Sequence, residues 1–332
     1  MRLTIFGGAG FVGSSVARKA VARGWTVTSV SRSGAPFRTP AGHAPSWVDK
    51  VQWHRGDVFR PSSYSALLAD SDAVVTTLGV LFERDYKTDS PGQGVSPLKV
   101  VRNVLESAAG GRGNPLDRQA RERSYERINR DSALTLFRAF SSSLPSPSPF
   151  PSPSPSTPAS SPFVFISAED IFRPFVPARY ITSKREAEEE MSRLALEAEG
   201  EAGRRVRPVF VRPSLMYHPH LSPPSTLPAT LLEASSRLSA LLPSSLHLPF
   251  LRPSPSSFPS SAPPPATASI GGLLSIPPIH VDAVGEAVCR AIEDGSVRGA
   301  VGVRGMRRML GMEEVGRDWE EEEREKERVV RM

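Results

Sequence analysis

Cysteine is almost absent from this chain, and its scarcity excludes one class of fold. The 332 residues contain a single cysteine, Cys289, so no intrachain disulfide can form. A disulfide-stabilised secreted domain is therefore excluded, and the protein either occupies a reducing compartment or is indifferent to redox conditions. Cys289 lies in the apolar stretch AVCRAI, which predicts a buried structural thiol rather than a nucleophile.

Long hydrophobic runs are also missing from the sequence. No stretch is long enough to cross a bilayer, so we expect no transmembrane segment. The first predicted strand begins almost at Met1, and we therefore expect no presequence. This favours a cytoplasmic location, unless import uses an internal signal.

The excess of positive charge is spread along the chain. The net charge is +6 and the isoelectric point is near 9.7, which suits a matrix or a nucleus as well as a cytosol. The chain has no lysine-rich block and no basic patch interleaved with aromatic residues. The segment 118–130 mixes both signs, as the solvated face of a helix does. We therefore expect no nucleic-acid partner.

Glycine, by contrast, is concentrated near the amino end. The motif GGAGFVG places Gly7, Gly8, Gly10 and Gly13 between an apolar run and a helical pattern, and a second strand pattern follows. In a strand–loop–helix–strand unit, such a loop exposes N–H groups at the helix N-terminus and attracts an anion. The spacing matches the dinucleotide fingerprint, in which the glycines allow the turn, the approach of the pyrophosphate and close packing of helix and strand. Phe11 and Val12 complete this predicted cofactor-binding set.

The end of the second predicted strand bears on the choice of cofactor. An acidic residue there binds the ribose 2′-hydroxyl of NAD, whereas an arginine accommodates the 2′-phosphate of NADP. The residues here are Ser31, Arg32 and Ser33, with no carboxylate close by. Arg32 therefore favours NADP(H), while NAD(H) and a purely solvated arginine remain alternatives.

Strand and helix patterns alternate and predict an α/β fold with a doubly wound parallel sheet. Apolar and alternating runs predict strands over 3–6, 25–30, 51–54, 73–78, 163–166 and 206–211. Helices are predicted after Gly13, over 125–140 and over 184–196. These elements form a nucleotide-binding core from residues 1–140 and 163–214.

Proline and serine dominate two stretches that cannot bury a core. Residues 141–162 are expected to form an exposed, disordered insertion. A second low-complexity loop, 222–265, interrupts a small substrate-side lobe over 215–312 and contains one apolar helix candidate near 231–242. Residues 313–332 form a charged tail without catalytic content.

Three residues of the second half could carry chemistry. Ser167 ends the fifth predicted strand, and Tyr180 and Lys184 lie one helical turn apart. An ammonium beside the phenol lowers the phenolic pKa from about 10, so that Tyr180 could exchange a proton while Ser167 bonds a carbonyl oxygen. Lys184 would also hold the ribose hydroxyls of a nicotinamide cofactor, which supplies the hydride.

Taken together, these motifs resemble the short-chain dehydrogenase/reductase superfamily, which has a Rossmann fold and binds NAD(P). The likeness is carried by GGAGFVG, Gly56-Asp57, Thr77-Leu78-Gly79, Asn129, Ser167, Tyr180-x-x-x-Lys184 and Arg212-Pro213. It implies that Asp57 and Val58 flank the adenine and that Gly79 lines the cofactor groove. It also assigns Thr77, Leu78, Arg212 and Pro213 to the cofactor-binding set. Ser214 stands where the family usually has glycine.

A narrower resemblance is to the fungal atypical reductase-like proteins of coenzyme Q biosynthesis, relatives of the Rossmann-fold accessory subunit of complex I. It is carried by FISAED, VPARYITSKREAEEE, VRPSLMYHP and PPIHVDAVGEAV. It implies a mitochondrial protein on the matrix side of the inner membrane, peripheral membrane association and partners in the coenzyme Q synthesis complex. The implied substrate resembles a quinone precursor, and a cytosolic reductase or epimerase remains an alternative.

Simpler interpretations stand beside these assignments. Ser167 could cap the following helix, and Tyr180 and Lys184 could hold only ribose, as in a non-catalytic accessory or assembly protein. The acidic run Glu186, Glu188, Glu189 and Glu190 is expected to be a solvated face. His218 and His220 are interpreted as loop residues rather than metal ligands, because no cysteine or carboxylate is near them in sequence. Asp282 is expected to be a helix N-cap.

Overall fold

The computed structural model describes residues 1–79, 126–144, 160–170, 176, 178–202, 205–221 and 276–312. Within these residues, seven parallel strands form one sheet in the order β3-β2-β1-β4-β5-β6-β9. The strands are β1 (Arg2–Phe6), β2 (Thr26–Ser31), β3 (Val51–Arg55), β4 (Ala73–Thr76), β5 (Ser161–Ile166), β6 (Val206–Val211) and β9 (Gly299–Val301). The chain reverses direction across the sheet beside β1, which places the β1–α1 loop at the crevice where doubly wound sheets bind ligands.

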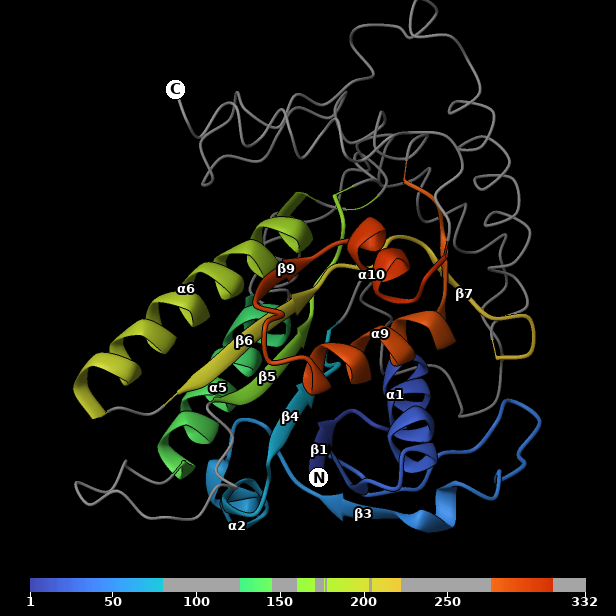
Figure 1. The fold of residues 1–332 in the computed structure, drawn as a ribbon. Helices are drawn as coiled ribbons and strands as arrows, with labels where there is room; N and C mark the ends of the chain where they lie inside the picture. Colours follow the sequence, from blue (N-terminus) through green and yellow to red (C-terminus); the bar gives the residue numbers. More distant parts are fainter. Residues whose placement is uncertain are drawn as a thin grey trace, which may run out of the picture.

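Helices cover both faces of the sheet (Figure 1). On one face, α1 (Phe11–Ala22) packs against α9 (Val281–Glu293), and α10 (Val303–Met309) adjoins α9. On the other face lie α2 (Ser65–Ala69), α5 (Ser132–Ser143) and α6 (Ala178–Ala202). Each helix layer shares a separate hydrophobic core with the sheet. The predicted doubly wound α/β fold is thus confirmed.

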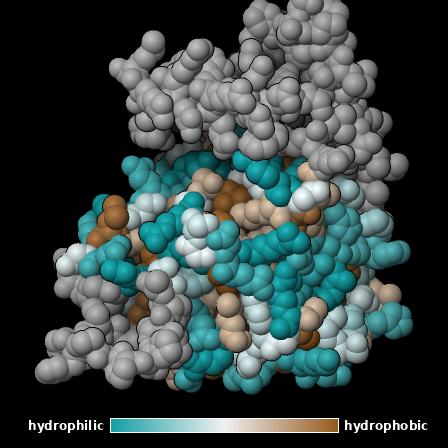
Figure 2. Space-filling model, viewed as in Figure 1, coloured by the Kyte–Doolittle hydropathy of each residue, from teal (hydrophilic) through white to brown (hydrophobic). Residues whose placement is uncertain are grey.

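Short elements complete the described fold. A π-helical turn, Glu126–Asp131, leads into α5, and 3₁₀ turns occupy Val48–Lys50 and Pro61–Ser63. A second, two-stranded parallel sheet pairs β7 (Met216–Tyr217) with β8 (Ile279–His280). No helix among the described residues is long and apolar enough to cross a membrane. The face seen in Figure 1 is mainly hydrophilic in its described part (Figure 2).

Six predicted strands are present, with shifted ends. The strand predicted over 73–78 ends at Thr76 because Thr77 bonds back to the glycine loop, its Oγ donating to the carbonyl of Phe6 at 3.0 Å. The helix predicted over 184–196 begins earlier and ends later, at Ala178 and Ala202. Strand β9 was missed, because three residues, GAV, are too short for a periodic pattern.

The predicted insertion and lobe are partly within the described residues. Helix α5 continues to Ser143 and β5 begins at Ser161, so both ends of the segment 141–162 belong to regular elements. The described part of the 215–312 region adds β9 to the edge of β6 and packs α9 on the sheet, so this part shares the main core. The loop 222–265, its helix candidate at 231–242 and the tail 313–332 lie outside the described residues.

Candidate functional site

The glycine loop between β1 and α1 is too tightly folded for side chains. Gly7 has φ +90°, a conformation that residues with a Cβ rarely adopt. Its N–H donates to the carbonyl of Val30 at 3.0 Å, and its carbonyl accepts from the N–H of Gly10 at 2.9 Å. A Cβ on Gly13 would lie 2.2 Å from the carbonyl oxygen of Gly7. The glycines at positions 7 and 13 are therefore required by the backbone itself.

The N-terminus of α1 fits an anion. Gly10 is the N-cap residue and offers no side chain to bond the first amides of the helix, and the first turn contains no acidic residue. The N–H groups of Phe11, Val12 and Gly13 have no preceding turn to bond to, and the helix dipole adds partial positive charge. A diphosphate satisfies these donors, so the loop passes a structural test for a dinucleotide.

The second and third strands end beside this loop. Arg32 follows β2 and is exposed, and no hydrogen bond or ion pair joins its guanidinium to the part of the chain that the structure describes. Asp57 follows β3, and its carboxylate accepts from the N–H of Phe59 at 3.1 Å. The carbonyl of Val58 accepts from the hydroxyl of Tyr64 at 2.8 Å. The adenine-flanking role of Asp57 and Val58 stays a prediction.

The structure brings three predicted residues together at the end of β4. A Cβ on Gly79 would lie 3.1 Å from both the amide oxygen of Asn129 and the ammonium nitrogen of Lys184. Lys184 is 2% exposed, and its Nζ donates to the carbonyl of Ile166 at 2.7 Å. Burial lowers the pKa of Lys184 from 10.5 to about 7, because the charged form loses its hydration. Leu78, beside Gly79, packs at the margin of the core on the α5–α6 face.

Tyr180 and Ser167 flank this lysine. Tyr180 is half-buried on α6, and its ring centroid lies 5.6 Å from Nζ of Lys184. Ser167 directly follows β5 and is 3% exposed, and its N–H donates to the carbonyl of Val211 at 2.7 Å. Helix α6 begins at Ala178, so Ser167 does not cap it. The predicted catalytic trio thus lies at the carboxyl ends of the central strands.

Sequence reasoning missed a buried charge network behind Ser167. Glu188, expected on a solvated face, is 4% exposed and accepts from Arg212 and Arg185. The interpretation of the acidic run is therefore wrong for Glu188. Arg212, predicted to bind cofactor, directs its guanidinium to this glutamate, and its backbone N–H donates to Val301 at 2.9 Å. The signal in the sequence is the spacing: Glu188 stands four residues after Lys184, which places both on one face of the helix.

The residues that follow Arg212 join the sheet to neighbouring segments. The carbonyl of Pro213 accepts from the N–H of Glu169 at 2.9 Å. The hydroxyl of Ser214 donates to the carbonyl of Pro277 at 2.7 Å, so the serine that replaces the usual glycine ties the end of β6 to the segment before β8. Cofactor contacts of Pro213 stay a prediction.

Two histidines and an aspartate gather at the start of α9. The expectation for Asp282 is wrong, because the N-cap is His280, whose Nδ1 accepts from the N–H of Asp282 at 3.2 Å. Nε2 of His218 lies 3.9 Å from the Asp282 carboxylate, so a carboxylate is near in space although distant in sequence. His220 is not part of this group of three.

The hydrogen bonds of this cluster do not suit a metal. Nδ1 of His218 accepts from the N–H groups of His220 and Leu221, both at 3.1 Å. A neutral imidazole that accepts at Nδ1 carries its proton on Nε2, so neither ring nitrogen has a lone pair left for a metal. Nδ1 of His280 also accepts, from the N–H of Asp282. The three side chains are therefore interpreted as a hydrogen-bonded cluster, and the expectation of no metal stays a prediction.

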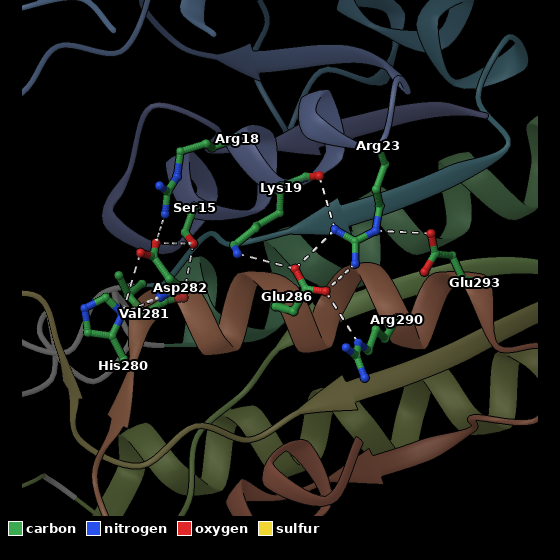
Figure 3. A network of polar contacts seen from close by, with 10 residues as sticks. All are labelled: Ser15, Arg18, Lys19, Arg23, His280, Val281, Asp282, Glu286, Arg290 and Glu293. Atoms are coloured by element: carbon green, nitrogen blue, oxygen red, sulfur yellow. Dashed lines mark hydrogen bonds and ion pairs between the residues drawn. The ribbon is translucent and has the colours of Figure 1, made fainter. Parts of the chain in front are cut away.

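A polar network ties α1 to α9 (Figure 3). Ser15 donates to the carbonyl of Val281 at 3.1 Å and to the carboxylate of Asp282 at 3.0 Å. Arg23 pairs with Glu286, 2.5 Å from Nη2 to the carboxylate, and this hydrogen bond lowers the pKa of Glu286 to about 2. These contacts hold the helix whose N-terminus forms the anion site.

Comparison with known proteins identifies the family. The sequence is 33% identical over 219 residues to MIOREX complex component 2 of Saccharomyces cerevisiae, covering 66% of this chain and 74% of that protein. It is 42% identical over 78 residues to an uncharacterized chloroplastic protein of Arabidopsis thaliana, covering 24% of each chain.

Among solved structures, an oxidoreductase of the short chain dehydrogenase/reductase family from Burkholderia thailandensis shares the fold. The TM-score is 0.53 at 15% identity, over 94% of this chain and 98% of that one. The family description "NAD dependent epimerase/dehydratase family" matches residues 3–245. Since this match spans well over half of the sequence, the chain belongs to the NAD dependent epimerase/dehydratase family.

Proposed function

We propose that this protein binds a nicotinamide dinucleotide, with the diphosphate at the N-terminus of α1. The observation that carries the proposal is the side-chain-free turn at Gly7 and Gly13, which leaves the first amides of α1 directed at an anion. When bound, the cofactor supplies the hydride, and the protein supplies binding and proton transfer.

NADP(H) is the preferred cofactor in this proposal. Arg32 stands at the end of β2, where a carboxylate would exclude a 2′-phosphate, and it is exposed and uncommitted within the described chain. The carboxylate of Asp57, which follows β3, already accepts from the backbone N–H of Phe59.

The protein is proposed to reduce or oxidise a small carbonyl or hydroxyl compound. Ser167 would bond the substrate oxygen, and Tyr180 would give or take the proton. Lys184 supports this exchange because its pKa near 7 keeps an ammonium and a neutral amine both accessible at physiological pH. A quinone precursor is the proposed substrate, following the sequence resemblance to reductase-like proteins of coenzyme Q biosynthesis.

A mitochondrial role among partner proteins is the proposed setting. The sequence resemblance supports the matrix side of the inner membrane, and the relative named as a MIOREX complex component supports association with other proteins. That relative also favours a second candidate, a nucleotide-binding accessory protein that does not turn over substrate.

Equilibrium binding of NADPH and NADH tests the cofactor proposal. We expect NADPH to bind at least tenfold more tightly than NADH and Arg32→Ala to remove this difference, since an arginine–phosphate pair is worth about 1.5–3 kcal/mol. Arg304→Ala, which removes an exposed arginine from α10, is the matched control and should change neither affinity. Equal affinities that Arg32→Ala leaves unchanged would refute the preference, and no binding of either would refute the proposal.

Complementation in cells separates the enzyme from the accessory protein. Gly10→Asp places a carboxylate at the anion site and should abolish function in both cases. Tyr180→Phe keeps the ring and removes the proton donor. Loss of function with retained NADPH binding supports an enzyme, and full complementation supports an accessory protein.

A further inference from the structure

Helix α6 holds the backbone on both sides of Ser167. Nζ of Lys184 donates to the carbonyl of Ile166 at 2.7 Å, and Nη2 of Arg185 donates to the carbonyl of Ala168 at 2.7 Å. Two consecutive residues of one helix therefore hold the carbonyls of the residues before and after the serine. Helix α6 thus contributes to the position of the serine.

Arg185 also contacts the serine side chain. Its Nη1 lies 3.2 Å from Oγ of Ser167. A guanidinium has only donors, so the serine oxygen must accept in this bond. The hydroxyl proton of Ser167 is then left for a different acceptor. Since Ser167 is 3% exposed, water hardly competes for that proton.

The guanidinium of Arg185 is itself held in place. Nη1 also donates to the carboxylate of Glu188 at 2.7 Å, and the Glu188 side chain is 5% exposed. Arg212 approaches the same carboxylate from the end of β6, with Nε at 3.1 Å. Glu188 thus keeps a cationic partner when Arg185 is replaced, so a variant at position 185 does not leave this buried carboxylate unpaired.

We propose that Arg185 is a positioning residue for Ser167, which fixes the serine oxygen as an acceptor toward α6 and so directs the hydroxyl proton to the substrate oxygen. This inference rests on the proposed function for its chemical consequence. The bond between Arg185 and Ser167 exists independently of turnover and can be measured separately. Arg185 also carries positive charge beside Lys184 and helps to hold the pKa of that lysine low.

A double-mutant cycle on thermal unfolding tests the bond in the full-length protein. The variants are Arg185→Leu, Ser167→Ala and the double variant, with Ser167→Thr as the conservative substitution that keeps a hydroxyl. Arg130→Leu is the control, because Arg130 is about as exposed as Arg185 and pairs with Glu186 of α6.

The cycle has two decisive outcomes. If the bond exists, Ser167→Ala lowers the melting temperature of the wild type but changes that of Arg185→Leu by less than about 1 °C, because contacting residues are not additive. Ser167→Thr should retain the coupling, and Arg130→Leu should show none with Ser167→Ala. Additive shifts in the cycle at positions 167 and 185 overturn the proposal.

Turnover of NADPH with 9,10-phenanthrenequinone as probe tests the consequence. We expect Arg185→Leu to lower kcat about tenfold with KM unchanged, the loss of one oriented hydrogen bond in the transition state. Arg185→Leu removes a positive charge beside Lys184, so the pKa of Lys184 should rise and the acid limb of the kcat–pH profile should move to higher pH. Arg185→Lys keeps the charge and should leave the profile in place. An unmoved profile and an unchanged kcat in Arg185→Leu overturn the proposal. If the wild type turns over no such probe while it binds NADPH, the reductase proposal fails, and the unfolding cycle still decides whether Arg185 holds Ser167.

Discussion

Replacing Lys184 by methionine is expected to change how the stability of this protein depends on pH. Lys184 is buried, and its pKa falls from 10.5 in water to about 7 in the folded protein. Between these two values the unfolded chain binds more protons than the folded one, so wild-type stability rises as pH increases through this window. Methionine keeps a similar length and cannot take up a proton.

The expected size follows from the pKa difference. Each unit is worth about 1.4 kcal/mol, and most of the shift falls between pH 6 and pH 10, so the wild type should gain about 4 kcal/mol relative to Lys184→Met over this range. For a protein of this size that corresponds to about 10 °C in melting temperature. At pH 6 the methionine variant should be the more stable of the two.

The assay is thermal unfolding of both proteins at intervals from pH 6 to pH 10 without nucleotide. Lys50→Met is the control, because Lys50 is exposed and its removal should leave the pH dependence of the wild type intact. Parallel melting curves for the wild type and Lys184→Met across the whole range would show that Lys184 is not desolvated, and the pKa argument for its role would then be lost.

Three further predictions concern the parts that hold the site. Gly13→Ala should prevent nucleotide binding and cost about 2–4 kcal/mol in stability, because its Cβ would collide with the carbonyl of Gly7, whereas Gly295→Ala, which meets nothing within 4 Å, should be neutral in both binding and denaturation assays. Glu286→Gln should lower stability by about 1 kcal/mol at pH 7, allowing for its partial exposure. Its carboxylate has a pKa near 2, so the difference should vanish as pH falls from about 5 to 2, as measured by urea unfolding. Arg207→Met should cost about 3 kcal/mol, because the buried guanidinium donates to two carbonyls at the end of α9 and to that of Val297 beyond it, and calorimetry should show this loss at every pH from 5 to 9.

The nucleotide-binding half could be predicted from sequence because its signals are local. The bond between Gly7 and Gly10, the packing of Gly13 against Gly7 and the first turn of α1 involve residues that are close neighbours in sequence. The inner strands β1, β4, β5 and β6 are largely buried on both faces, so they appear as short apolar runs with recognisable ends.

The remaining features depend on partners that the sequence does not reveal. Glu188 looks like one more acid in a charged run, but it is buried on α6 and pairs with Arg212, which directly follows β6. Asp282 looks like a cap, but His280 fills that role and leaves the carboxylate to Ser15 of α1. Charge and capping preference predict a role for a residue at such a position, but tertiary packing decides which group it bonds to.

The bond between Ser15 and Val281 spans 266 residues of chain, and it has a consequence for synthesis on the ribosome. Val16, Ala17 and Ala20 of α1 belong to the core that α9 completes, so the side of α1 that packs on α9 stays uncovered until the last part of the domain has been translated. The nascent chain therefore exposes apolar surface on α1 for most of its elongation. A fragment that stops before residue 281 should need a chaperone to stay in solution.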